Sequence, residues 1–504
     1  MKKSGMEKFS AYVERVGNKI PHPMLLFISF AFAIMLISHV LYMMGVNVLL
    51  NGEEVYVKSL LTSDGVRHIF NNAVANFQGF SAMPIVIVGM LGVGVAEGVG
   101  LIGATLKKAL LGAPPKVAIV MVVFIGVMSS IASDAGYLVV IPLGGAIFYS
   151  MGRHPLAGIA AAFAGVSAGF GANLIVGPVD AMVVEITNEA IASIGGTLQL
   201  NILANWYFSI ASTFLITAVA SLITIFITEP TLGEYKGDKV EDKSNEITPE
   251  ENRGLKFALF CLIGVLIFLG ALTIPAGAPL RDPATGLIIP EVGSSPFMNS
   301  IVFVIMITFV VPAIGYAFGS GVAKKPKDIV PFAGKAMQEM GPMIALMFFV
   351  SQFINYISYT QIGTLLAVNG ANFVTSSGIN GLPLILVFVL LCLLLNIVVP
   401  GMIGKWAIFA PIFVPMLMKA GINPAMVQAA YRIGDSGSNI ISPIMSYFVL
   451  IITFAQKYDK EAGAGTIIAL MLPYTIFVTL AWMFMLAIWF FFGLPLGPGA
   501  FVTM

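Results

Sequence analysis

Apolar runs of about 20 residues recur from one end of this 504-residue chain to the other. Because ~20 apolar helical residues cross the ~30 Å hydrocarbon core of a bilayer, such runs indicate membrane-spanning helices. Only 10% of the residues are charged, compared with roughly 25% in a typical soluble domain. The sequence therefore predicts an all-α polytopic membrane protein. Simple spans are expected at 23–45, 81–106, 202–228, 254–274, 298–320, 339–367 and 465–493.

The distribution of lysine and arginine predicts the orientation, because positive residues collect in cytoplasmic loops. The charged start of the chain and the loops near Lys107, Arg153, Lys324 and Lys457 would then share the cytoplasmic face. That start has no cleavage pattern, so we expect a cytoplasmic N-terminus and not a signal peptide. The mixed-charge segment 229–253 is predicted to be a cytoplasmic linker between two halves.

Two apolar stretches, 117–152 and 383–418, do not fit a simple crossing. A straight helix of about 36 residues would be ~54 Å long, which exceeds one crossing, and two crossings would need more residues. Their centres read SSIASDAG and PGMIGK, which contain helix-breaking residues. We therefore predict that each stretch is a re-entrant helical hairpin that enters to the midplane and leaves on the same side.

The hairpins belong to an internal repeat. Tyr137, Pro142, Pro155, Asn173 and Pro178 in the first copy correspond to Trp406, Pro411, Pro424, Asn439 and Pro443 in the second. An odd number of expected crossings separates the hairpins, so the copies are predicted to be inverted. The predicted units are a first repeat over 1–228, with its hairpin near 117–152 and a broken helix near 155–196, the linker 229–253, and a second repeat over 254–504, with its hairpin near 383–418 and a broken helix near 424–456. Inverted repeats with broken helices are typical of secondary transporters.

The broken helices supply candidate ion ligands. Unwound backbone occurs at the membrane midplane only where protein groups or a water-filled cavity supply hydrogen bonds to its N–H and C=O groups. The segments SAGFGANLIVGPVD (167–180) and GDSGSNIISP (434–443) are such breaks, and they contain Asn173, Asp180 and Asn439. Free carbonyls and these side chains are candidate ligands for a coupling cation, Na⁺ being the only metal considered. The alternative is that the breaks are packing kinks.

Ionisable side chains inside a membrane are costly and mark candidate functional positions. Asp180 follows the first break and is a candidate for binding a coupling proton. Arg432 and Asp435 lie three residues apart, on one face of a helix. Either they form a structural ion pair, or Arg432 binds a substrate carboxylate, which its planar guanidinium suits.

The hairpin tips carry further candidates. Trp406 offers a ring on which an aromatic substrate could stack, and its alternative role is an interfacial anchor. Lys405 would donate to substrate or neutralise Asp435, unless its chain extends to the membrane surface. Ser133 and Asp134 occupy the equivalent tip in the first half.

Several classes of protein are disfavoured. The chain has no Walker loop, HExxH, GxSxG or clustered metal-binding residues, which argues against an enzyme and against a cofactor. A net charge of +1 gives no indication of nucleic-acid binding. Cys261 and Cys392 both lie in expected spans, so no disulfide framework is implied.

The sequence resembles the AbgT family of p-aminobenzoyl-glutamate transporters and antimetabolite exporters, almost from end to end. The resemblance rests on YVERVGNKIPHPMLLF, SDAGYLVVIPLGGAIFYSMGRHPLAG, GANLIVGPVDAM, NWYF, KWAIFAPIFVPM, YRIGDSGSNIISP and GLPLGPGAF. It implies nine transmembrane helices plus two opposed hairpins, a homodimer, and location in a bacterial inner membrane. The positions that it marks as important are Asp180, Trp406, Pro424, Arg432, Asp435 and Pro443. Ile403 stands where the family often has a hydroxyl, which puts one substrate contact in question.

The expected function is H⁺- or Na⁺-coupled transport of p-aminobenzoyl-glutamate or a related aromatic carboxylate. As the resemblance implies, sulfonamide antifolates are further candidate substrates. The direction of transport is not encoded in these features. Two alternatives are a sodium-coupled dicarboxylate transporter, which Trp406 weakly disfavours, and an ion channel.

Overall fold

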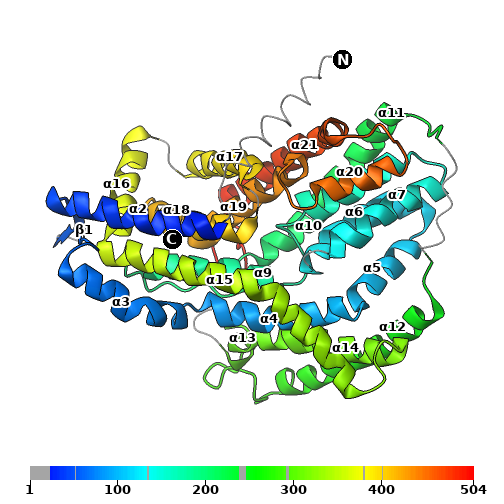
Figure 1. Ribbon diagram of the computed structural model, residues 1–504, viewed down its shortest axis with the longest axis horizontal. Coiled ribbons are helices and arrows are strands. Elements are labelled where there is room, and N and C mark those ends of the chain that lie inside the picture. The colour runs from blue at the N-terminus through cyan, green and yellow to red at the C-terminus, as the bar shows by residue number, and fades with distance from the viewer. Residues whose placement is uncertain are drawn as a thin grey trace.

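The chain is almost entirely helical in the computed structural model, which describes residues 23–50, 53–132, 135–237, 246–290, 295–378, 381–399 and 401–504 (Figure 1). The helices are α2 (Pro23–Met43), α3 (Ser63–Gln78), α4 (Ala82–Gly98), α5 (Leu101–Leu111), α6 (Ala118–Met128), α7 (Ile141–Ser150), α8 (Pro155–Phe163), α9 (Pro178–Ala192), α10 (Trp206–Ile223), α11 (Glu229–Leu232), α12 (Pro249–Thr273), α13 (Pro296–Asn299), α14 (Ile301–Ser320), α15 (Val330–Thr360), α16 (Ile362–Ser377), α17 (Leu382–Val398), α18 (Met402–Lys419), α19 (Pro424–Gly437), α20 (Phe448–Gln456) and α21 (Ala464–Phe492). Strands β1 (Asn47–Leu50) and β2 (Glu53–Tyr56) pair antiparallel.

The predicted all-α polytopic class is confirmed. Within the described ranges, eight helices are long and apolar enough to cross a membrane, or nine if the bent pair formed by α5 and the helix after it counts as one span. The two members of that pair differ in direction by 106°. Large hydrophobic side chains are exposed along α2, α12 and α21, as expected for helices that face lipid.

Three predicted boundaries are wrong. The span expected at 81–106 ends at Gly98, because Gly100 adopts φ 90° and the chain turns into α5. The span expected at 339–367 is divided at Gln361, which has φ 63° between α15 and α16. The span expected to begin at residue 254 starts earlier: α12 begins at Pro249, because Thr248 and Glu251 form a capping box there.

Both predicted hairpins are present as pairs of helices. In the first, α6 and the 3-10 turn η2 (Ser129–Ala132) lead to the tip, and the π-helical turn η3 (Gly136–Val140) and α7 lead away. In the second, α17 and α18 flank the tip near Gly401, whose φ of 94° allows a sharp reversal there. At ~1.5 Å per residue, the 11-residue α6 reaches about 17 Å, roughly half of a hydrocarbon core.

Both predicted broken helices are also present. α8 and the π turn η4 (Ala164–Ala168) are separated from α9 by an irregular stretch. α19 is separated from α20 by a stretch that contains one 3-10 turn, η8 (Asn439–Ile441). The packing links the two halves: α17 lies against α19, while α18 lies against α9.

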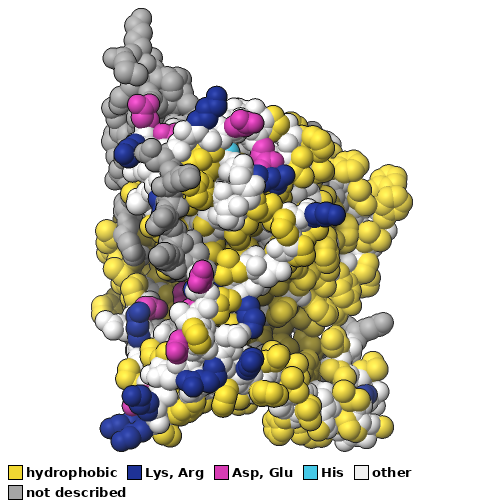
Figure 2. All heavy atoms as spheres, turned by 90° about the vertical axis from the view of Figure 1, so that its right-hand side faces the viewer, with side chains coloured by type: hydrophobic (Ala, Val, Ile, Leu, Met, Phe, Trp, Pro, Cys, Tyr) yellow, Lys and Arg dark blue, Asp and Glu magenta, His cyan; other side chains and the backbone are white. Residues whose placement is uncertain are grey.

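The side chains of lysine and arginine gather on the face formed by the right-hand side of Figure 1, between wide hydrophobic areas (Figure 2). Ion pairs join elements there: Lys107 lies 3.3 Å from Glu251, and Arg153 lies 3.4 Å from Glu229. A charged face at one end of apolar helices is what a membrane protein presents to water.

We predict that the histidine cap of α8 makes stability depend on pH. The backbone N–H of Leu156 donates to His154 Nδ1 over 3.3 Å, so the cap requires a deprotonated Nδ1. Burial lowers the pKa of His154 below its ordinary value, although Asp459 opposes this shift. The unfolded chain therefore binds more protons, and stability is full above about pH 6.5 and falls as the pH drops through the folded-state pKa.

The matched variant is His154→Asn, because Asn423 caps α19 in the same way, accepting from the N–H of Ala425 over 2.9 Å. His154→Asn should keep the cap and lose this pH dependence, whereas His154→Leu should cost about 1 kcal/mol at neutral pH. Thermal unfolding in detergent at several pH values measures both. An unchanged pH profile in His154→Asn would contradict the assignment.

Candidate functional site

The two breaks interlock at the centre of the molecule. The backbone N–H of Gly171 in the first break donates to Ser436 Oγ over 2.9 Å. A Cβ at Gly171 would lie 2.7 Å from that oxygen and 3.1 Å from Arg432 Cβ, so only glycine allows this approach. Asn439 Nδ2 in the second break donates to the carbonyl of Ser167 over 3.4 Å. Backbone N–H and C=O groups that one break leaves without a helical partner are thus hydrogen-bonded by the other half, because buried polar groups need hydrogen-bond partners.

The first ion pair joins Asp180 to Arg432. Arg432 Nη1 lies 2.7 Å from Asp180 Oδ1, and both side chains are buried. Asp180 is the third residue of α9, and its Oδ2 accepts from the N–H of Gly177 over 2.7 Å. The amide of Asn173 reaches the same oxygen at 3.5 Å. A carboxylate at the start of α9 is also favoured by the helix dipole.

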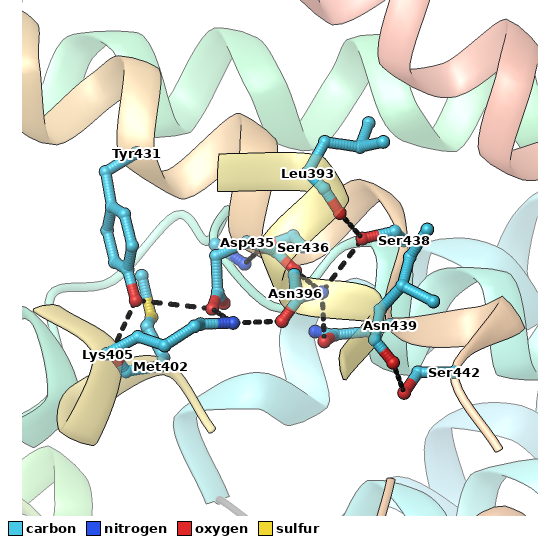
Figure 3. A network of polar contacts seen from close by, with 12 residues as sticks. Leu393, Asn396, Met402, Lys405, Tyr431, Asp435, Ser436, Ser438, Asn439 and Ser442 are labelled. Carbon is cyan, nitrogen blue, oxygen red and sulfur yellow. Dashed lines mark hydrogen bonds and ion pairs between the residues drawn. The ribbon is translucent and has the colours of Figure 1, made fainter. Parts of the chain in front are cut away.

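The second ion pair joins Lys405 in the hairpin to Asp435 in α19. Lys405 Nζ lies 2.7 Å from Asp435 Oδ1, and each side chain is 1% exposed (Figure 3). The Arg432–Asp435 pair considered from the sequence is therefore wrong. Helical spacing placed those residues on one face, but each finds its partner on another helix. Lys405 instead pairs with Asp435 and neutralises it, which is one of the roles predicted for Lys405.

Asn396 in α17 connects this pair to the second break. Its Oδ1 accepts from Lys405 Nζ, and its Nδ2 donates to the carbonyl of Asp435, to Ser438 Oγ over 3.0 Å and to Asn439 Oδ1 over 2.9 Å (Figure 3). One amide thus fixes the lysine, the backbone of Asp435 and the break together. Asn396 is not among the residues predicted from the sequence, although a single asparagine in the apolar run LLCLLLNIVV was a usable signal.

Trp406 holds the hairpin against α9. Its ring is 0% exposed and packs on Tyr431 with centroids 4.5 Å apart. Its Nε1–H lies 3.0 Å from both the carbonyl of Val183 and Thr187 Oγ1. Gln428 Nε2 reaches the same two acceptors from α19. In this conformation, stacking of a substrate on Trp406 would require the hairpin to move.

A cavity of about 280 Å³ lies between both hairpins and both breaks. Two predicted site residues, Asp435 and Asn439, line it, together with Ile403. Its wall also contains Phe170, the stacked pair Tyr137 and Tyr447, and six methionines. Arg432, Lys405 and Trp406 are not among the residues that line it.

A second, small cavity of about 10 Å³ adjoins the Asp180–Arg432 pair, between α9, α10 and α19. Asn173 and Asn205 also line it. Two buried atoms there, Arg432 Nε and Asn205 Oδ1, have no hydrogen-bond partner in the described structure. The two ion pairs therefore border different cavities.

The remaining sequence candidates occupy supporting positions. Pro424 is the first residue of α19, where the absence of an N–H costs nothing. Pro443 follows η8 in the second break. Ser133 and Asp134 lie outside the described residues. The sequence analysis also missed Thr187, Gln428, Tyr431 and Tyr447, whose roles depend on contacts between distant segments.

Two hairpins and two broken helices around buried charges are the architecture of a membrane transporter. Comparison with known proteins agrees. The model of the AbgT putative transporter family matches residues 8–504. The p-aminobenzoyl-glutamate transport protein of Escherichia coli (strain K12) is 34% identical over 496 residues, covering 98% of this chain and 97% of that protein. The chain therefore belongs to the AbgT family, and it is a membrane transporter and not an enzyme.

Two solved structures are similar over nearly the whole chain. The YdaH transporter of Alcanivorax borkumensis, described as having an unusual topology, has a TM-score of 0.90 and 40% identity, covering 95% of this chain and 100% of its own. MtrF of Neisseria gonorrhoeae, described as illuminating a class of antimetabolite efflux pumps, has a TM-score of 0.90 and 42% identity, covering 98% of this chain and 100% of its own.

We predict that Lys405 and Asp435 stabilise the fold only as a pair. Lys405→Met leaves a buried carboxylate without its cation and should cost about 3–5 kcal/mol. Lys405→Met combined with Asp435→Leu removes both charges and should recover much of that loss. Unfolding in detergent, followed by circular dichroism, measures the free energy. If Lys405→Met alone were as stable as the unaltered protein, that result would contradict the prediction that the two side chains stabilise the fold as a pair.

We predict that Trp406 anchors the hairpin mainly through its N–H. Trp406→Phe keeps a ring against Tyr431 and loses the donor, while Thr187→Val removes an acceptor. Each should weaken the anchor by about 1 kcal/mol and increase amide hydrogen exchange in α18. Exchange in α12, which lies in another part of the molecule, serves as the internal control. Unchanged protection of α18 in both variants would rule out the anchoring role.

Proposed function

We propose that the protein is a cation-coupled secondary transporter, driven by H⁺ or Na⁺, of p-aminobenzoyl-glutamate or related aromatic carboxylates and of antifolates such as sulfonamides. The observation that carries the proposal is the buried Asp180–Arg432 ion pair, which joins the two halves. A second buried pair, Lys405–Asp435, lies beside the central cavity. The E. coli relative is named for transport of p-aminobenzoyl-glutamate, and MtrF is described with antimetabolite efflux pumps.

The cavity wall supports an aromatic substrate. Ligand sites are mostly apolar, with a few polar groups that fix orientation. Phe170 and the Tyr137–Tyr447 stack, 4.5 Å between centroids, supply ring surfaces, and methionines supply an adaptable lining. A purely aliphatic dicarboxylate would leave these surfaces without a matching partner, so a sodium-coupled dicarboxylate transporter is the less favoured alternative.

The Asp180–Arg432 pair supports coupling to a cation. Asp180 is a buried carboxylate whose charge is balanced by Arg432 at 2.7 Å. A proton or Na⁺ at Asp180 would release Arg432 from the pair. To bind a carboxylate of the substrate, Arg432 would then have to move from the small cavity that it borders here toward the large one. Asn173, whose Nδ2 lies 3.5 Å from Asp180 Oδ2, also carries an amide oxygen, which is a further candidate ligand for Na⁺. Asn439 belongs to the wall of the large cavity. Binding of the cation changes whether Arg432 is free for the substrate, and binding of the substrate changes whether Asp180 is free for the cation. The two binding events are therefore linked.

We place the protein in a bacterial inner membrane, as a homodimer surrounded by lipid, with its N-terminus in the cytoplasm. The relatives are bacterial, and the face shown in Figure 2 carries several lysine and arginine side chains. Under the positive-inside rule, that face is the cytoplasmic one.

The proposal is tested by reconstitution into liposomes, with flux of p-aminobenzoyl-glutamate and a sulfonamide measured under imposed H⁺ and Na⁺ gradients. We expect saturable flux that depends on one of the two gradients. Flux of substrate in the same direction as the driving ion indicates symport, and flux in the opposite direction indicates antiport. Asp180→Asn cannot change charge and should abolish gradient-driven flux. Asp282→Asn is the matched control, because Asp282 lies in an exposed loop far along the chain from the site, and its carboxylate accepts the backbone N–H groups of Ala284 and Thr285.

Undiminished coupled flux in Asp180→Asn would remove Asp180 from the coupling mechanism. Flux that does not saturate and needs no second gradient would indicate an ion channel. Transport of aliphatic dicarboxylates alone would favour the dicarboxylate transporter.

A further inference from the structure

One carboxylate oxygen of Asp435 is left for a ligand. Asp435 Oδ1 contacts Lys405 Nζ at 2.7 Å and the hydroxyl of Tyr431 at 3.3 Å. No hydrogen bond to Oδ2 is present in the described part of the chain. Asp435 is nevertheless 1% exposed and belongs to the wall of the large cavity. Because Asp435 lines the cavity and a carboxylate oxygen accepts hydrogen bonds, this position favours a ligand that donates one.

The charge at this end of the cavity is already balanced. Lys405 is 2% exposed, contacts both Asp435 and Asn396, and does not line the cavity. The lining contains no lysine or arginine within the described ranges. A ligand carboxylate would therefore meet an acceptor here, which is unfavourable, and a ligand cation would meet a carboxylate that Lys405 has already neutralised. A neutral donor fits best.

A second acceptor lies in the same wall. Asn439 Oδ1 receives one hydrogen bond, from Asn396 at 2.9 Å, and an amide oxygen has two lone pairs. A primary amine has two N–H groups, whereas a hydroxyl has one. The surrounding Phe170, Tyr137 and Tyr447 provide the aromatic surfaces against which a ring that carries the amine can pack.

We propose that Asp435, assisted by Asn439, determines specificity by accepting hydrogen bonds from a neutral primary arylamine of the substrate. This rests on the proposed transport of aromatic compounds and names the group that is recognised. The aminobenzoyl and sulfanilamide rings share a para-amino group and differ at the opposite end. Recognition of the amine end therefore admits both classes, while the anionic or sulfonamide end points away from Asp435.

The test is equilibrium binding to the purified full-length protein in detergent, with ligand pairs that differ only in the amine. One pair is sulfanilamide and benzenesulfonamide, and the other is p-aminobenzoyl-glutamate and benzoyl-glutamate. A hydrogen bond to a charged group contributes about 1.5–3 kcal/mol, so the amine should improve affinity by about ten- to a hundredfold. Lys405→Met with Asp435→Leu, which leaves no unpaired charge, should lose this preference, and Asp282→Asn should keep it.

Equal affinity of the unaltered protein for both members of a pair would overturn the inference, and this comparison needs no variant to fold. A preference that persists in the double variant would overturn it as well, as would failure to bind sulfanilamide. Coupled transport without a preference for the amine would contradict the inference about Asp435 but not the proposed function. A clear preference for the amine without any gradient-driven flux would contradict the proposed function but not the inference.

Discussion

A charge buried in a membrane protein must have a partner, and this requirement organises the centre of the molecule. Every residue of α19 is buried, and the helix carries one arginine and one aspartate. Arg432 finds its partner at the start of α9, and Asp435 finds its partner in the hairpin before α19. Because removing one member of a buried pair is costly, both pairs hold α19 to elements that come from different parts of the chain.

The same contacts divide the site into two chambers. Asp435 borders the large aromatic and methionine-lined cavity, while Asp180 and Arg432 border a separate, small polar cavity between α9, α10 and α19. The pair proposed to handle the coupling ion is therefore separated from the wall proposed to hold the substrate. A change in one pair can reach the other through α19, which carries a member of each, and through the breaks that Gly171 and Ser436 join. This is a physical route for linkage between two sites.

The sequence predicted the architecture well, because the architecture follows from length and composition. Residues 117–152 and 383–418 were too long for one crossing and too short for two, and both are hairpins. The breaks after Ala168 and Gly437 were visible as clusters of Gly, Ser and Asn. Helix ends were less predictable: Gly100 and Gln361 interrupt helices through positive φ angles, which the apolar pattern of the sequence does not report.

The partners within the site could not be predicted in the same way. Spacing along α19 suggested that Arg432 binds Asp435, but helical spacing reports only local neighbours, and the contact with Asp180 depends on tertiary packing. Trp406 was expected to face a substrate, and its stacking role stays a prediction because the ring is sealed between Tyr431 and α9 here. Polar residues within apolar runs, such as Asn396 and Gln428, were the signals that deserved more weight.

The most direct test of the account is a double-mutant cycle on Asp180→Asn and Arg432→Gln, with unfolding free energy and gradient-driven flux measured on each member. If the two side chains form a pair between the halves, the double variant will be more stable than the sum of the single effects predicts, by about 0.5–3 kcal/mol, while coupled flux stays absent. Strictly additive losses of stability, or coupled flux that survives in the double variant, would contradict a shared buried charge as the centre of this transporter.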